Sequence, residues 1–251
     1  MNLYEVIQPG NFLAEPEETT DRLSALLHLL TSTLVDAAIA LDLYEKSLAR
    51  SRESRSIEMD DGWEERRQEK LAVSRRIRAE RIAADPTAEF RFEETMLVDF
   101  LADQEIRAGE RERGVTPPIA IQREPFLHAR SFALALELIL KTLIELSKQP
   151  GAPAAISDLT AEFKAALPGL IDVRDSIHHV YERVQGKARR AELPTKSISI
   201  SNLGDGALHY TAADGSESSV PVGHGVAKLA QRIVQSALNA YNWRGYPVLL
   251  P

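Results

Sequence analysis

The sequence predicts a mainly α-helical bundle with a small antiparallel β-hairpin or meander before its last helix. Three observations lead to this prediction. Apolar residues recur every three or four positions over most of the chain, which is the spacing of one face of a helix. After Pro194 this spacing gives way to alternation in steps of two, in Lys196–Ser201. The segments between the predicted helices are short clusters of Pro, Gly and Asp, which are typical of turns.

The first long helix is expected at about Thr20 to Arg50. Its apolar residues keep a 3.5-residue spacing for nearly four heptads, which indicates packing along its length against another helix. They are Leu23, Leu27, Leu30, Leu34, Ala37, Leu41, Tyr44 and Leu48. Both a core helix of a bundle and a dimer contact have this pattern. The polar residues Ser51–Asp61 that follow are expected to be a linker.

The remaining helices are expected at about 64–81, 88–108, 126–148, 157–185 and 226–241. The 126–148 helix is apolar nearly all round, which places it in the middle of the bundle. Gly114–Pro125 contains three prolines and is expected to be a loop and an internal boundary. Residues 1–120 are then long helices that either form a separate domain or complete the bundle at 121–251. Ala207–Thr211 and Ser219–Val222 are the other expected strands, so the β element covers about 196–222.

Composition excludes several function classes. The chain of 251 residues has a formal net charge of −7, which argues against a general nucleic-acid coat protein but allows a local basic site. It has no cysteine, and this excludes disulfides, thiolate metal sites and cysteine nucleophiles. Charged residues interrupt both of its most apolar stretches, Leu23–Leu48 and Ser131–Leu146. We therefore expect a cytoplasmic protein without a membrane span.

The segment Leu170–Arg183 contains residues that carry chemistry. Arg174 occupies a position in an apolar stripe, and a guanidinium keeps its charge on burial. It therefore needs a carboxylate, a phosphate or a wet cleft. On a continuous helix, His178 lies about 40° from Arg174 and Tyr181 about 20°, whereas His179 lies about 140° away. At most one of the two imidazoles is then expected to share a site with Arg174.

Arg174, Asp175, His179 and Tyr181 stand in the order R-D-x3-H-x-Y. This segment resembles the R-x4-H-x-Y motif of the HEPN superfamily, whose minimal toxin members are helical-bundle ribonucleases. The longer string, with Glu182 and Arg183, also resembles uncharacterised bacterial helical proteins. The resemblance covers about 126–241 and implies that dimerisation brings two motifs together. A hairpin after the motif helix and the first ~120 residues depart from the family pattern.

This resemblance implies that the protein is a metal-independent endoribonuclease. It would act on an RNA substrate as a homodimer and without a cofactor. The RNA 2′-hydroxyl attacks the adjacent phosphate, with His179 as general base or acid. Arg174 holds the phosphate, Asp175 orients the imidazole, and Tyr181 binds phosphate or fills the apolar stripe. His178 is a second candidate, since helical geometry places it nearer to Arg174.

Four cations follow the motif and are the expected contacts to the RNA backbone. They are Arg183, Lys187, Arg189 and Arg190. The alternative for the last three is a solvated helix end, where cations also favour the C-terminal dipole.

The competing interpretation is a non-catalytic helical interaction or scaffold protein, with a protein partner. Arg174 then pairs with a buried acid such as Glu137, and His179 belongs to an exposed Asp175–His179–Arg183 ladder. Asp175-x2-His178 has the acid–His spacing of di-iron bundles, but such sites need a second pair from another helix. The sequence contains no other Asp/Glu-x2-His, so no metal is expected.

Overall fold

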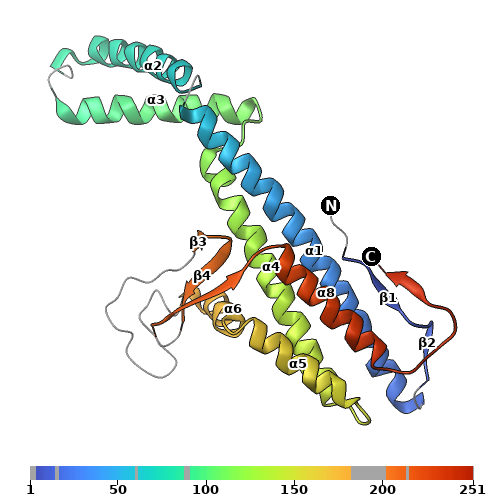
Figure 1. Ribbon diagram of the computed structural model, residues 1–251. Coiled ribbons are helices and arrows are strands. Elements are labelled where there is room, and N and C mark those ends of the chain that lie inside the picture. Colours follow the sequence, from blue (N-terminus) through green and yellow to red (C-terminus); the bar gives the residue numbers. More distant parts are fainter. Residues whose placement is uncertain are drawn as a thin grey trace. The chain divides into compact units, whose positions relative to one another are not determined.

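The computed structural model describes residues 4–14, 17–59, 62–87, 91–181, 202–212 and 215–250, with side chains except at 17–19, 54–59 and 62–63. Within these residues the chain forms seven helices and three small antiparallel sheets (Figure 1). This confirms the predicted mainly α fold. The chain divides into two compact units, which are Met1–Lys46 with Pro125–Pro251 (unit 1) and Ser47–Glu124 (unit 2). The sequence predicted a boundary near residue 120, with the residues before it either separate or part of the same bundle.

The helices are α1 Glu17–Met59, α2 Gly62–Ala84, α3 Phe92–Glu112, α4 Pro118–Ser147, α5 Ala154–Ala166, α6 Leu170–His178 and α8 His224–Asn239. The strands are β1 Val6–Gln8, β2 Phe12–Leu13, β3 Asn202–Gly204, β4 Ala207–Thr211, β5 Glu217–Pro221, β6 Trp243–Arg244 and β7 Val248–Leu250.

Two expected loops are helical. The predicted linker at 51–61 is wrong, because α1 continues to Met59. The predicted loop at 114–125 is wrong beyond residue 117, because α4 begins at Pro118. Proline fits the first turn of a helix, where its missing N–H has no intrahelical acceptor. Pro125 lies inside α4, where it is buried with the apolar side chains that follow it.

The single helix expected at 157–185 is also wrong, because α5 and α6 are separate. Pro168 lies between them and lacks the N–H that a continuous helix requires. Gly169 then brings the backbone against β5, since a Cβ atom there would lie 2.4 Å from the carbonyl oxygen of Ser219. The chain turns at this point, and α6 lies against β4 and β5 (Figure 1).

The core of unit 1 is formed by apolar faces of α1, α4, α5, α6 and α8. The predicted α1 stripe is confirmed from Leu23 to Tyr44, where every member is buried. The most deeply buried side chains of α4 recur every three or four residues and include Phe132, Leu136, Leu140 and Leu143. The predicted core position of this helix is therefore confirmed.

The β element is a three-stranded meander in the order β3-β4-β5. Leu208 of β4 faces Val220 of β5, and both side chains are buried in the core. Asp205 and Gly206 form the two-residue turn between β3 and β4, and both have positive φ, as the tight hairpin turn requires. The strand expected at Lys196–Ser201 lies outside the described residues.

Four strands near the chain ends pair with each other, and the sequence did not predict them. β1 pairs with β7 and β2 pairs with β6, both antiparallel. Gln235 of α8 binds the backbone of Ile7 on β1 twice, accepting from its N–H at 2.7 Å and donating to its carbonyl at 2.8 Å. The side-chain amide therefore replaces a neighbouring strand at this edge.

One described segment, Thr20–Glu53 of α1, has the length and apolar composition of a membrane-crossing helix. Half of its most apolar window is buried inside the protein, and the core helix of a soluble bundle has the same properties. One helix of this kind is weak evidence for a membrane span. The expected absence of such a span stays a prediction.

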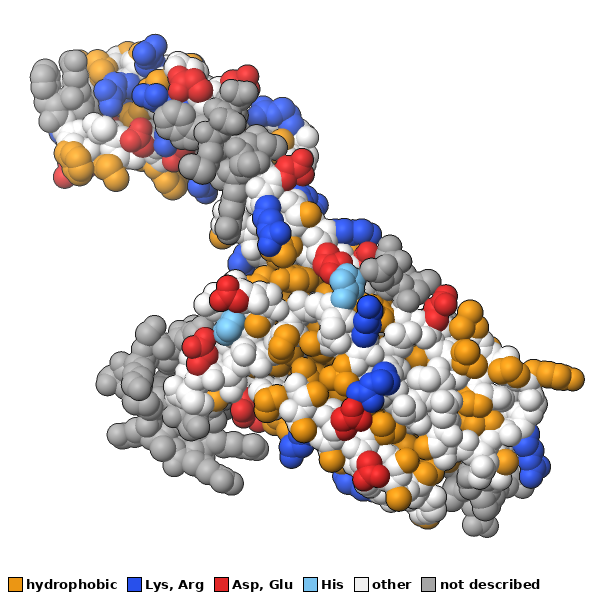
Figure 2. All heavy atoms as spheres, in the orientation of Figure 1, with side chains coloured by type: hydrophobic (Ala, Val, Ile, Leu, Met, Phe, Trp, Pro, Cys, Tyr) orange, Lys and Arg blue, Asp and Glu red, His pale blue; other side chains and the backbone are white. Residues whose placement is uncertain are grey.

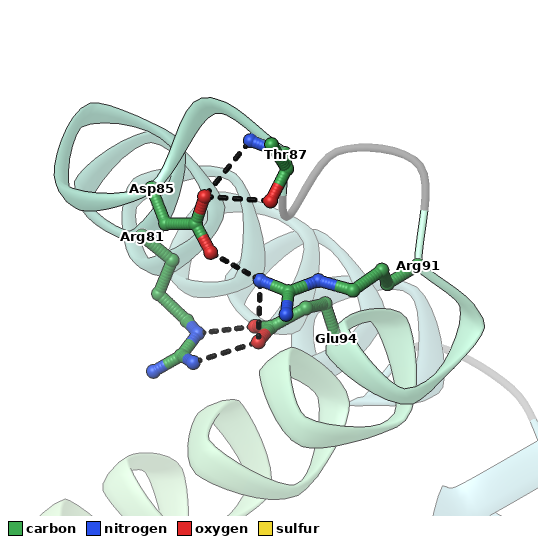
Figure 3. A network of polar contacts seen from close by, with 5 residues as sticks. All are labelled: Arg81, Asp85, Thr87, Arg91 and Glu94. Carbon is green, nitrogen blue, oxygen red and sulfur yellow. Dashed lines mark hydrogen bonds and ion pairs between the residues drawn. The ribbon is translucent and has the colours of Figure 1, made fainter.

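Unit 2 contains the antiparallel hairpin of α2 and α3. Ile77, Val98 and Ala102 form its small apolar core. A polar network lies at the turn of the hairpin (Figure 3), where Arg81 donates two hydrogen bonds to Glu94, at 2.5 and 2.9 Å. The hydrogen bond from Arg81 lowers the pKa of Glu94 below its usual value. The network fixes the two helices at the turn.

The same network contains a second carboxylate. Asp85 accepts hydrogen bonds from the backbone N–H of Thr87 at 3.0 Å and from its hydroxyl at 2.7 Å. The hydrogen bond from the Thr87 hydroxyl is the main cause that lowers the pKa of Asp85, and the bond from the Thr87 N–H is the next. Arg91 contacts Asp85 and connects it to Glu94 (Figure 3). The turn is therefore held by alternating charges.

The contact at Gly169 yields a prediction about stability. Gly169→Ala should lower the free energy of unfolding by about 1–3 kcal/mol, because the new methyl group overlaps backbone atoms of β5. Urea denaturation measures the change. The matched control is Gly225→Ala in α8, where a Cβ atom meets nothing within 4 Å and should stabilise the helix by up to about 1 kcal/mol. Equal effects of the two substitutions would contradict the close contact.

Candidate functional site

The short helix α6 positions the predicted motif residues. Arg174, Asp175 and His178 lie on it, whereas His179 is its C-cap and donates its backbone N–H to the Asp175 carbonyl at 2.9 Å. α6 ends at His178, the turn residue His179 follows, and Val180 and Tyr181 are helical again. The angles expected from one unbroken helix therefore hold only as far as His178.

Arg174 lies between two carboxylates. Its Nε atom is 3.0 Å from Oε1 of Glu137 on α4, and its Nη1 atom is 2.7 Å from Oδ1 of Asp175. The Nε atom is itself buried, and its contact with Glu137 is an ion pair without hydrogen-bond alignment. The side chain of Arg174 is 25% exposed and that of Glu137 is 8% exposed. Glu137 is therefore the buried acid that the competing interpretation required.

Glu137 has a second cationic neighbour on its own helix. Nζ of Lys141 lies 2.8 Å from the same carboxylate oxygen, and the Lys141 side chain is half exposed. A buried carboxylate is costly without a counter-charge. Arg174 and Lys141 together neutralise Glu137, and Arg174 at the same time joins α6 to α4.

Ser176 is a second polar anchor of α6, and sequence reasoning missed it. Its buried Oγ atom lies 2.7 Å from the carbonyl of Asp172 and 2.9 Å from that of Thr211 on β4. The one hydroxyl proton can serve either acceptor. On the neighbouring strand, Ser218 donates a hydrogen bond to Oδ2 of Asp172 at 3.2 Å. A small hydroxyl on the buried face of a predicted helix was the signal available in the sequence.

The motif side chains differ in exposure. His178 and Tyr181 are exposed, the latter at 74%, whereas His179 is half-buried. Among the described residues, Arg174 forms ion pairs with Glu137 and Asp175. The structure therefore joins Arg174 with Asp175 and Glu137. The predicted RNA-binding residues Arg183, Lys187, Arg189 and Arg190 lie outside the described residues.

Unit 2 contains a cleft that the sequence interpretation did not anticipate. A cavity of about 960 Å³ is lined by α2, α3 and the start of α4, and a hollow of about 330 Å³ adjoins it along α2. Arg67 and Lys70 line both. Together they form what we call the cationic cleft. Its cationic side chains are Arg66, Arg67, Lys70, Arg75, Arg78, Arg107 and Arg111, and its acidic ones are Asp99, Asp103 and Glu110.

The acids of the cationic cleft neutralise only part of its charge. Nζ of Lys70 lies 2.8 Å from Asp103, and Arg66 pairs with Glu110. Four of the remaining guanidinium groups make no ion pair with another described residue. They are those of Arg75, Arg78, Arg107 and Arg111. Figure 2 shows Lys and Arg side chains over α2 with acidic side chains between them. The sequence signal was available, because Arg67, Lys70 and Arg78 fall within about 80° on a helical wheel.

A tyrosine, a histidine and a glutamate form a third cluster, in unit 1. The hydroxyl of Tyr4 lies 2.5 Å from Nδ1 of His224, and Nε2 of His224 lies 2.9 Å from Glu45. Burial, and then the charge of Glu45, raise the pKa of Tyr4. Tyr4 is buried, whereas His224 and Glu45 are each 43% exposed. The cluster connects the N-terminal segment, α1 and the start of α8.

Within the described residues, no group of three or more His, Cys, Asp or Glu side chains could hold a metal ion. We find no match to a family model, to a curated protein or to a solved structure. The HEPN resemblance therefore stays a prediction.

The Arg174–Glu137 pair yields a prediction that separates a structural from a phosphate-binding role. Arg174→Met should lower the free energy of unfolding by about 1–3 kcal/mol, because Glu137 keeps only Lys141 as a counter-charge. The double substitution Arg174→Met with Glu137→Met should recover most of this loss, since no buried charge then remains. Chemical denaturation of the four proteins in the cycle measures the coupling. Additive effects would show that the pair contributes nothing to folding.

Proposed function

We propose that the protein is a non-catalytic helical interaction protein in which the R-x4-H-x-Y segment is structural. The observation that carries the proposal is the position of Arg174 between the buried Glu137 and Asp175. Two carboxylates already neutralise the guanidinium, and a phosphate would have to displace at least one of them. Displacing Arg174 from Glu137 would leave a buried carboxylate with one neighbouring cation.

The second candidate is the metal-independent endoribonuclease that the HEPN resemblance implies, acting as a homodimer on RNA. It is supported by the exposure of part of this segment. A quarter of the Arg174 side chain faces solvent, and His178 on the same short helix is exposed. A second copy of the chain would have to supply the rest of such a site. Homodimerisation, RNA binding and a cytoplasmic location stay predictions.

An RNA-cleavage assay without metal tests the proposal against this second candidate. The purified protein is incubated with labelled single-stranded RNA in EDTA, beside His179→Ala and His178→Ala variants. We expect the same background cleavage from all three proteins, because the imidazoles take no part in a reaction. An acid–base residue of a ribonuclease contributes about 10²–10⁴-fold to the rate.

Cleavage that either histidine substitution reduces by that factor, with unchanged thermal unfolding of the variant, would contradict the proposal and establish the ribonuclease. Including both variants also decides which imidazole acts. The unfolding control is needed because His179 is half-buried at the end of α6.

A further inference from the structure

The cationic cleft of unit 2 has a charge opposite to that of the whole chain. The protein has a formal net charge of −7, yet seven cationic side chains line the cleft beside three acidic ones. Cations that gather in this way repel one another. No described carboxylate is in ion-pair contact with four of them, Arg75 and Arg78 on α2 and Arg107 and Arg111 on α3. The cleft is therefore suited to an anionic ligand.

The length of the cleft indicates a chain-like ligand. Arg67 and Arg78 lie eleven residues apart on α2, which corresponds to about 17 Å along the helix axis. Arg67 and Lys70 line both hollows, and Arg78 lines the smaller one. A single phosphate or carboxylate would contact only one part of this surface, whereas an extended or helical segment could contact all of it.

The lining is apolar as well as cationic. Ile119 is 66% exposed and Val115 is 45% exposed, and they line the larger cavity together with Pro117 and Pro118. Exposed aliphatic side chains in a cleft favour a ligand with apolar side chains of its own. The described residues that line the two hollows include no Phe, Tyr or Trp, the side chains on which RNA bases stack. These two features favour a peptide over a nucleic acid.

We propose that the cationic cleft binds an acidic amphipathic segment of a partner protein. Carboxylates of the segment pair with Arg107 and Arg111, because the guanidinium fork matches a carboxylate with two hydrogen bonds. Apolar side chains on the same segment pack against Val115 and Ile119, as an amphipathic helix does in a groove. The inference rests on the proposed function, since it names where the interaction protein binds and what chemistry its partner has.

Fluorescence anisotropy with the full-length protein tests this inference. The probe is a labelled 14-residue peptide with Leu on one helical face and Glu on both flanks. The comparison probes are the same peptide with Lys in place of Glu, the Glu peptide with Ser in place of Leu, and a 12-nucleotide uridine RNA. We expect the Glu–Leu peptide to bind at least tenfold more tightly than each of the others, and more weakly as salt is added.

Charge reversal then locates the site. Arg107→Glu with Arg111→Glu should weaken binding of the Glu–Leu peptide at least tenfold, and Ile119→Ser should weaken it severalfold. The matched control is Lys228→Glu with Arg244→Glu, two exposed cations of unit 1, which changes the net charge equally and should leave binding unchanged. Circular dichroism confirms that each variant is folded.

Equal binding by the cleft variant and the control variant would overturn the inference, as would absence of binding by the Glu–Leu peptide. Tighter binding of the RNA, lost in the cleft variant, would also overturn it and make the cleft a nucleic-acid site. Failure of the proposed function has a separate readout, because it appears as metal-free RNA cleavage that depends on His178 or His179. Peptide binding without such cleavage supports both proposals.

Discussion

The ion pair between Glu137 and Arg174 is the interaction on which the proposed role of α6 depends. Glu137 interrupts the apolar surface of α4 in the core of unit 1, and a carboxylate there requires a cation. Arg174 supplies it from α6 and also contacts Asp175. Ser176 and Gly169 then fix the same helix against the β3-β4-β5 meander, through a hydrogen bond and a close backbone approach. Two residues of the ribonuclease-like motif, Arg174 and Asp175, therefore take part in contacts that position α6.

Helical periodicity was enough to predict the fold class and most of the core. The α1 stripe, the buried position of α4 and the strand Ala207–Thr211 follow from local spacing. The pairing of β1 with β7 could not be predicted, because strands of two or three residues have too little pattern and their partners are more than 200 residues apart. The break between α5 and α6 was readable from Pro168, but the continuous apolar stripe across it concealed the signal.

The candidate site was predictable only in part. An arginine in an apolar stripe requires a counter-charge, and Glu137 was identifiable as a partner because it interrupts an otherwise apolar helix. Sequence could not decide between this carboxylate and a phosphate, since both satisfy a guanidinium equally well. The cationic cleft was missed for a different reason. Arg and Glu alternate along α2, and only the packing of α3 and the start of α4 beside it separates paired cations from unpaired ones.

The most direct test of the structural role of Arg174 is NMR observation of its guanidinium Nε–H group during addition of RNA. The signal is assigned by its loss in Arg174→Lys, and the added oligonucleotide carries 2′-O-methyl groups so that it cannot be cleaved. If Glu137 and Asp175 occupy the guanidinium, the ¹H and ¹⁵N shifts of this group stay constant at every RNA concentration. A saturable shift of this signal, with the rest of α6 unperturbed, would show that phosphate reaches Arg174 and would contradict the structural role.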